Sequence, residues 1–190
     1  MFERLSESIN KKVKLTDEEL ELCKSFFIPK KLRRKQYLLQ EGDVCNRIAF
    51  VEKGALYSYS IDNKGAQRVI QFAFEGWWIA DLYSFFTREP SNLNIEVLEE
   101  CELLLIEPAQ LEKLMQVVPA YNTYTRMVYQ DAYVALQRRI EGTIGLTAEE
   151  KYSRFMSSYA SIINRVPQHL IASYLGVTPE TLSRIRKQIV

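Results

Sequence analysis

The sequence predicts an α+β fold in three parts, on the strength of three observations. Residues 29–107 contain short β-type runs separated by turn residues at roughly ten-residue spacing, which indicates an antiparallel sandwich or a closed, jelly-roll-like β-roll. Residues 120–141 contain neither Gly nor Pro, so they favour one long helix. Residues 168–187 have the pattern of two short helices around a tight turn.

The first 28 residues are expected to form two helices. Leu5, Ile9 and Val13 recur at four-residue spacing, which places them on one helix face. Thr16 precedes three acidic residues. A threonine in that position caps a helix, and the acids suit its positive N-terminus. We therefore expect a second helix to begin after Thr16.

Strands are expected in the region that follows, where β-branched and aromatic residues alternate with polar ones. The expected strands are residues 36–40, 47–52, 55–61, 67–74, 93–98 and 102–106. The run from Asp62 to Gly65 lies between two of them and predicts a hairpin turn.

A long helix is expected after the strands. Pro108 is expected to begin a short helix and Pro119 the long one, which Gly142 and Gly145 are expected to break after a length of about 33 Å. Apolar residues surround this helix, so more than one face needs a cover. We expect one face to pack on the β-roll and another to pair with a second copy in a homodimer; burial within a monomer is the alternative. The expected interface residues are Tyr121, Tyr124, Val128, Asp131, Ala132 and Ala135.

The last forty residues differ from the rest of the chain in charge. They carry six basic residues and one acidic residue, a net +5, whereas residues 1–150 carry 19 basic and 23 acidic residues, a net −4. A basic end on an acidic body favours contact with a polyanion there. Thr147 and Glu150 form a capping-box pattern, so a helix is expected from this point to a turn at residues 164–167.

Residues 168–187 match a helix-turn-helix. Gly176 can supply the positive φ of the turn, and Thr178 and Pro179 suit the start of a second helix. Buried apolar or small residues are required at fixed offsets. They are Ile171, Ala172, Leu175, Val177, Leu182 and Ile185, with Ile189 extending the same face. The alternative is an ordinary helical hairpin of an α-helical bundle.

The opposite face of this second helix carries side chains that suit DNA. Arg184 could pair with guanine O6 and N7, and Glu180 could accept from cytosine N4. The N–H groups that open the helix suit a phosphate. The expected DNA-binding residues are Gln168, His169, Thr178, Glu180, Thr181, Ser183, Arg184 and Lys187. Gln168, His169 and Lys187 are expected to contact the phosphate backbone; a solvated helix face is the alternative for each residue.

Composition excludes several chemistries. The chain has one His and three Cys that form no C-x-x-C pattern, so no metal site built from several histidines is expected, and no enzyme of the cupin type. The scattered cysteines indicate reduced thiols and a cytoplasmic protein. No signal peptide is expected at the N-terminus, and no apolar run is long enough to span a membrane.

The order of these elements resembles the CRP/FNR family of bacterial transcription regulators over nearly the whole chain. The segments that carry the resemblance are 39–43, 50–56 and 103–106 in the β-region, and Thr178, Glu180, Thr181 and Arg184 in the recognition helix. The resemblance implies a sensor domain at 1–118, a dimerisation helix and hinge at 119–146, and a winged-helix-like DNA-binding domain at 147–190. It implies a homodimer on double-stranded operator DNA, with RNA polymerase as a candidate further partner.

The sequence departs from the family pattern at the cyclic-nucleotide cassette. Ala80 and Asp81 stand where the family has Gly and Glu, and Ser91 stands where it has the Arg that holds the cyclic phosphate. A buried phosphate would lose its charge-assisted partner there, although Arg88 lies close enough to substitute. Cyclic AMP is therefore not the expected effector.

Other effectors of the family also fit poorly. Three Cys are too few for an iron–sulfur cluster, and the sensor region has no His for haem. An uncharged or organic effector is expected near Trp77, Trp78, Asp81, Tyr83, Arg88 and Ser91. The alternative is that the chain has no small effector at all. The sequence ends soon after the recognition helix, so most of the family's β-hairpin wing is expected to be missing. The alternative function is a ligand-binding or protein-interaction module whose helix-turn-helix no longer reads DNA.

Overall fold

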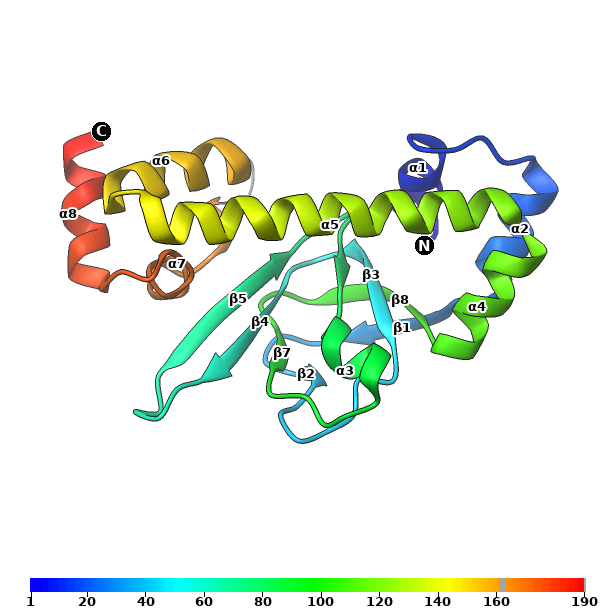
Figure 1. The fold of residues 1–190 in the computed structure, drawn as a ribbon, viewed down its shortest axis with the longest axis horizontal. Helices are drawn as coiled ribbons and strands as arrows, with labels where there is room; N and C mark the ends of the chain where they lie inside the picture. The colour runs from blue at the N-terminus through cyan, green and yellow to red at the C-terminus, as the bar shows by residue number, and fades with distance from the viewer. Residues whose placement is uncertain (161–162, 190) are drawn as a thin grey trace.

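The computed structural model describes residues 1–160 and 163–189. The β-roll lies along one side of a long helix, α5, and shorter helices lie at both ends of α5 (Figure 1). Helices α1, α2 and α4 lie at one end, and α6, α7 and α8 lie at the other. In this part of the chain, no helix is both long and apolar enough to cross a membrane.

The roll consists of two antiparallel four-stranded sheets. The first has the strand order β1 (Ile28–Leu32), β8 (Cys101–Ile106), β3 (Ile48–Lys53) and β6 (Trp78–Ile79). The second has the order β2 (Tyr37–Leu39), β7 (Asn94–Val97), β4 (Leu56–Ile61) and β5 (Gln67–Ala73). Side chains from both sheets fill the space between them, as in other sandwiches.

The six expected strands are confirmed, but β1, β6 and helix α3 (Leu82–Thr87) were not predicted. Strand β1 contains Pro29 and is mostly exposed; it lies at the edge of its sheet, where a missing N–H is tolerated. The expected hairpin joins β4 to β5, and there the N–H of Asp62 donates to the carbonyl of Ala66 at 3.0 Å. Gly65 has φ +77°, which explains the glycine in that turn.

The N-terminal helices close one end of the roll. Helix α1 (Glu3–Asn10) is fixed to β3 because the carboxylate of Glu52 accepts the backbone N–H groups of Arg4 and Leu5. Helix α2 (Asp17–Ser25) begins with a capping box at Thr16, as expected. Helix α4 (Pro108–Val117) begins at Pro108 and turns Leu111 and Leu114 inward.

Helix α5 (Pro119–Gly145) is longer than expected, at 27 residues and about 40 Å. Pro119 occupies its first turn, as predicted. The expected break at Gly142 is wrong: the helix continues to Gly145. A Cβ at Gly142 would lie 3.3 Å from Nη1 of Arg154, so this glycine permits a close approach of α6 rather than ending the helix.

The C-terminal helices share a core with the roll. Helix α6 (Ala148–Tyr159) starts at the expected Thr147 capping box, but it ends at Tyr159 rather than at residues 164–167. A short 3-10 helix, η1 (Ile163–Arg165), leads to α7 (Gln168–Leu175) and α8 (Pro179–Ile189). Phe72 and Phe74 of the roll pack in one cluster with Phe155 of α6.

Candidate nucleic-acid interface

Helices α7 and α8 form the helix-turn-helix pair expected from the sequence. Gly176 has φ +70° and ends α7 in the left-handed conformation. The hydroxyl of Thr178 accepts from the N–H of Thr181 at 3.2 Å, and Pro179 opens α8. The turn therefore forms from local hydrogen bonds and backbone preference, which are properties the sequence encodes directly.

The apolar positions expected between the helices are buried, except that Val177 is only half-buried. The buried residues are Ile171, Ala172, Leu175, Leu182 and Ile185. The small Ala172 is fully buried between the helices, and its carbonyl accepts from the N–H of Val177 at 3.0 Å. The side chain of Ile189 lies outside the described part of the chain.

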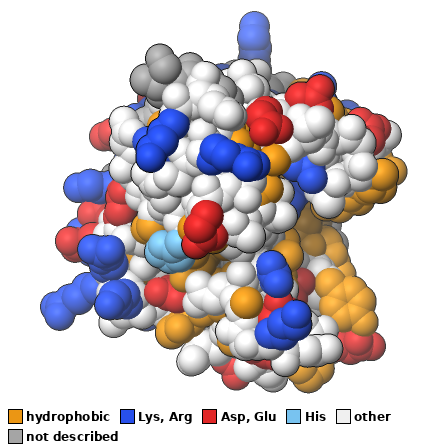
Figure 2. Space-filling model, turned by 90° about the vertical axis from the view of Figure 1, so that its left-hand side faces the viewer, with side chains coloured by type: hydrophobic (Ala, Val, Ile, Leu, Met, Phe, Trp, Pro, Cys, Tyr) orange, Lys and Arg blue, Asp and Glu red, His pale blue; other side chains and the backbone are white. Residues whose placement is uncertain are grey.

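The expected DNA-facing residues lie on the outer surface of this pair. The exposed ones are Gln168, His169, Thr178, Glu180, Ser183, Arg184 and Lys187. Thr181 is half-buried, and its hydroxyl pairs with that of Thr178 at 3.1 Å. Figure 2 shows this end of the molecule, with Lys and Arg side chains, acidic side chains and the histidine on its surface.

Hydrogen bonds at the start of α8 favour the ionised form of Glu180. The pKa of Glu180 is lowered by hydrogen bonding from its own backbone N–H and from Thr178. Glu180 is therefore ionised at neutral pH and can only accept hydrogen bonds. Within the described residues, neither Arg184 nor Lys187 forms a salt bridge. Both cations are free to meet an anion.

The helix pair is held against the roll by polar contacts that the sequence analysis missed. The hydroxyl of Ser173 donates to the carbonyl of Gln67 at 2.7 Å and accepts from the N–H of Val69 at 3.0 Å. Arg139 of α5 donates to the carbonyl of Val69 at 2.8 Å and lies over the ring of Tyr174. These contacts dock α7 on strand β5.

A second contact joins η1 to the roll through Arg165. Its guanidinium donates to Glu75 with both terminal nitrogens at 2.8 Å, and to Glu99 at 2.7–3.1 Å. Burial would raise the pKa of Glu75, but hydrogen bonds from Arg165 and from backbone N–H groups, including that of Gly54, lower it to about 2. No signal in the sequence could have paired these residues, because they are 66 and 90 positions apart.

The six residues expected to form an effector pocket do not gather around one space. Asp81 caps α3 by accepting from the N–H groups of Tyr83 and Ser84, and it also accepts from the hydroxyl of Ser91 at 2.6 Å. Tyr83 and Arg88 are exposed. Asp81 and Ser91 therefore pair with each other in the interior, and an effector bound at these residues stays a prediction.

The two tryptophans, Trp77 just before β6 and Trp78 at its start, pack against different parts of the chain. Trp77 packs against Tyr159 of α6 with ring centroids 5.7 Å apart. Trp78 faces the long helix, and its indole N–H donates to the hydroxyl of Tyr124 at 3.1 Å. Of the six expected pocket residues, Trp78 alone lines the cavity between the roll and α5.

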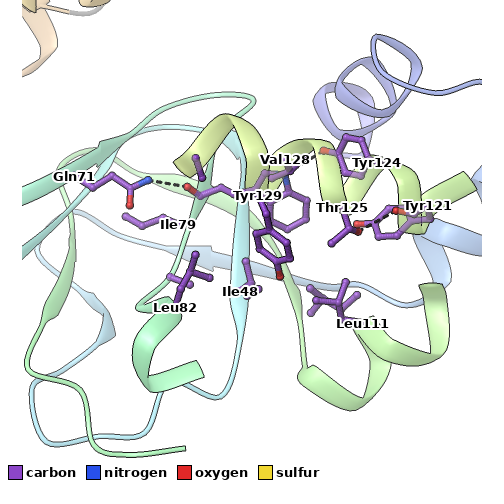
Figure 3. Close-up of a pocket in the computed structure, with 14 residues that line it drawn as sticks. Ile48, Gln71, Ile79, Leu82, Leu111, Tyr121, Tyr124, Thr125, Val128 and Tyr129 are labelled. Atoms are coloured by element: carbon purple, nitrogen blue, oxygen red, sulfur yellow. Dashed lines mark hydrogen bonds between the residues drawn. The ribbon is translucent and has the colours of Figure 1, made fainter. Parts of the chain in front are cut away.

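That cavity has a volume of about 110 Å³. Ile48, Leu82 and Tyr129 lie around it in Figure 3, and its lining carries no Asp, Glu, Lys, Arg or His side chain. Polar groups at its edge already have partners: Gln71 donates to the carbonyl of Trp78, and Thr125 donates to that of Tyr121. The space suits a small, uncharged, apolar group.

The long helix presents a different surface from the one expected. Tyr121 and Tyr124 are buried on the roll, so their placement in a subunit interface is wrong: the helix turns these rings toward its own chain. Val128 is half-buried, and Asp131 is paired with Lys12. Ala132 and Ala135 are exposed.

Exposed apolar side chains continue along the second half of α5. The large ones are Tyr133, Val134, Leu136, Ile140 and Ile144, with 68, 44, 54, 52 and 82 % of their surface accessible. Residues 133, 136, 140 and 144 follow each other at steps of three and four, so they form one stripe on the helix. Such a stripe matches the seam between two paired helices.

The sequence of this chain matches a known domain family, and its fold is similar to those of known proteins. Residues 29–117 match the family model of the cyclic nucleotide-binding domain. The structure resembles the c-di-GMP-responsive global regulator CLP of Xanthomonas campestris at 14 % identity, covering 92 % of this chain and 91 % of that one, with a TM-score of 0.72. No curated protein matches the sequence.

Two further solved structures are similar. A mutant of CooA from Carboxydothermus hydrogenoformans is 17 % identical, with coverage of 93 % and 86 % and a TM-score of 0.73. FixK2 of Bradyrhizobium japonicum is 19 % identical, with coverage of 86 % and 84 % and a TM-score of 0.72.

Proposed function

We propose that this chain is a cytoplasmic, sequence-specific DNA-binding transcription regulator. It has the fold of the CRP/FNR regulators, a non-enzymatic family, around a cyclic nucleotide-binding domain. The observation that carries this proposal is the face of α8. Its inner residues are buried, whereas Glu180, Ser183, Arg184 and Lys187 are exposed on the outer side. A helix of this kind fits the major groove, with side chains near its start against base edges.

The roles of these residues follow from their chemistry. Arg184 offers two donors that fit guanine O6 and N7, and ionised Glu180 offers an acceptor that fits cytosine N4. Gln168, His169 and Lys187 lie on the same exposed surface and suit phosphate oxygens. Thr181 takes no base contact in this proposal, because its hydroxyl is paired with that of Thr178.

DNA selection followed by fluorescence anisotropy tests this function. The selected duplex should bind at least a thousandfold more tightly than random DNA, and log Kd should rise steeply with salt. Replacing Arg184 with Ala should cost about 1–3 kcal/mol on the selected site and leave random DNA nearly unaffected. The control is Arg34→Ala, an exposed arginine on the roll. Equal affinity for selected and random DNA would contradict the proposal.

We propose further that two copies pair through the second half of α5. The stripe from Tyr133 to Ile144 would otherwise leave four large apolar side chains in water, and helix pairing covers such a seam. Light scattering should give twice the 22.2 kDa chain mass. Ile140→Asp should give the single-chain mass, whereas Ile61→Asp, which places the same charge at a similarly exposed isoleucine on β4, should remain a dimer. A wild-type monomer at micromolar concentration would refute the pairing.

The effector that we propose is a small, uncharged, apolar molecule and not cyclic AMP. The interior position where the family pattern has an Arg is occupied by Ser91, whose hydroxyl is bound to Asp81, so no buried cation is available there for a cyclic phosphate. The cavity beneath α5 is lined by uncharged residues. Calorimetry with cyclic AMP should show no binding, and micromolar binding of cyclic AMP would overturn this assignment.

A further inference from the structure

A groove lies where the end of α5 meets α6, apart from both the α8 face and the cavity beneath α5. Its volume is about 640 Å³, which is within the range of sites that hold small molecules. The two helices form its walls, and Trp77 of the roll and Tyr174 of α7 contribute to its lining. It thus joins the roll, the long helix and the C-terminal helices.

The groove is strongly basic. Arg138 and Arg139 line it from α5, Lys151 and Arg154 line it from α6, and Glu141 is the single acid. Among residues 1–160 and 163–189, no carboxylate lies within salt-bridge distance of any of these four cations. The lining therefore carries a net charge of +3. Glu150 of α6 lies outside the lining but close enough to Arg154 for that cation to help lower its pKa.

Hydrogen bonds within the chain explain part of this arrangement. Lys151 donates to the carbonyl of Thr143 at 3.1 Å, and Arg154 donates to the carbonyl of Arg138 at 3.4 Å. These cations therefore stabilise the end of α5, whose carbonyls together carry about half a negative charge. That partial charge does not neutralise the groove, and the guanidinium of Arg138 has no hydrogen-bond partner in the described part of the chain.

The guanidinium of Arg154 lies where α5 and α6 come close together. Gly142 has no side chain, which allows the guanidinium of Arg154 to lie against α5; a Cβ there would be 3.3 Å from its Nη1. Next to the cations, Trp77 keeps 38 % of its surface accessible while one side of it packs on Tyr159. The groove thus combines pre-positioned cations with an accessible indole.

We propose that this groove binds a small phosphorylated molecule, whose multiply charged phosphate group is held by Arg138, Lys151 and Arg154. Three cations on two walls match a group with several anionic oxygens better than a single carboxylate. Binding there goes beyond the proposed DNA recognition and does not depend on it. A ligand bound there would also bridge α5 and α6. In its absence these two helices are joined by the hydrogen bonds from Lys151 and Arg154 of α6 to backbone carbonyls of α5.

Calorimetry on the full chain tests this site with three probes: ADP, inorganic pyrophosphate and adenosine. ADP and pyrophosphate should bind with one site per chain, and adenosine should not bind. Arg138→Gln should weaken ADP binding by about tenfold, and ADP should quench tryptophan emission in the wild type but not in Trp77→Phe. The matched control is Arg126→Gln, an exposed arginine on α5 outside the groove, which should bind ADP normally.

With the small probes, any of three results would overturn the site: absence of ADP and pyrophosphate binding, equal binding of adenosine, or ADP binding unchanged by Arg138→Gln. Arg138→Gln is the decisive variant because it removes no hydrogen bond of the fold, and its thermal melting should match that of the wild type. Binding of long double-stranded DNA in place of ADP, lost in the same variant, would reassign the groove to DNA and equally refute the proposal. The test uses no operator, so its failure would leave the proposed DNA recognition standing.

Discussion

Removal of the guanidinium of Arg165 should loosen the contact between the C-terminal helices and the roll. Arg165→Gln breaks the bidentate contacts to Glu75 and Glu99 and leaves two carboxylates close together without their cation. Breaking a fully buried pair in this way costs about 3–5 kcal/mol. These side chains keep between 26 and 36 % of their surface accessible, so solvent screening reduces the expected cost to about 2 kcal/mol.

The same variant should change how stability depends on pH. The pKa of Glu75 falls from 4.5 to about 2 in the folded chain, so folded Glu75 holds its proton less tightly than unfolded Glu75. This contribution is therefore fully present above pH 4.5 and is lost as the pH falls from 4.5 toward 2. As the pH falls from 4.5 toward 2, the Arg165→Gln variant should therefore lose less stability than the wild type does.

Urea unfolding followed by tryptophan fluorescence, repeated between pH 3 and pH 7, measures both effects. The matched control is Arg68→Gln, which breaks a solvent-screened pair with Asp62 and should cost clearly less than Arg165→Gln. The reasoning fails if Arg165→Gln costs no more than Arg68→Gln at pH 7. It also fails if the two variants lose stability in parallel as the pH falls.

Two further predictions concern the interior of the roll. Gly54→Ala should destabilise the chain by more than about 3 kcal/mol in urea unfolding, because residue 54 has φ +96° and a new Cβ would lie 2.4 Å from a backbone carbonyl oxygen; Gly65→Ala, in an open turn, should cost clearly less, and equal costs would contradict the steric argument. Cys23 and Cys101 should react with a thiol reagent at pH 8 only after unfolding, because burial raises their pKa values to about 11 and 12; rapid labelling of the native chain would contradict this.

Local signals explain which parts of the fold could be predicted. Helix starts at Thr16, Thr147 and Thr178 are fixed by residues within three positions of each cap, and the hairpin at Asp62 depends on a turn of four residues. Strand β1 lacks such a signal, since it is mostly exposed and contains Pro29. Its position depends on pairing with β8, about 70 residues further along the chain.

The candidate site divides in the same way. The α7–α8 pair was predictable because its buried residues lie at fixed spacing along one short segment. The surroundings of Asp81 and Ser91 were not predictable. Alignment with the family pattern predicted that both residues contact a ligand, whereas in the structure their side chains are hydrogen-bonded to each other. For the long helix, apolar content alone could not tell the buried Tyr121 and Tyr124 from the exposed Ile140 and Ile144.

The hydrophobic cluster that Phe72 and Phe74 share with Phe155 has a consequence for modularity. The C-terminal helices share one hydrophobic core with side chains of strands β4 and β5. A fragment of residues 147–190 would lack those side chains and would expose its apolar residues to water. Such a fragment should not fold autonomously, and heat should melt the helices and the roll in a single cooperative transition. An engineer who wishes to transplant this helix pair must therefore carry the β4–β5 hairpin with it.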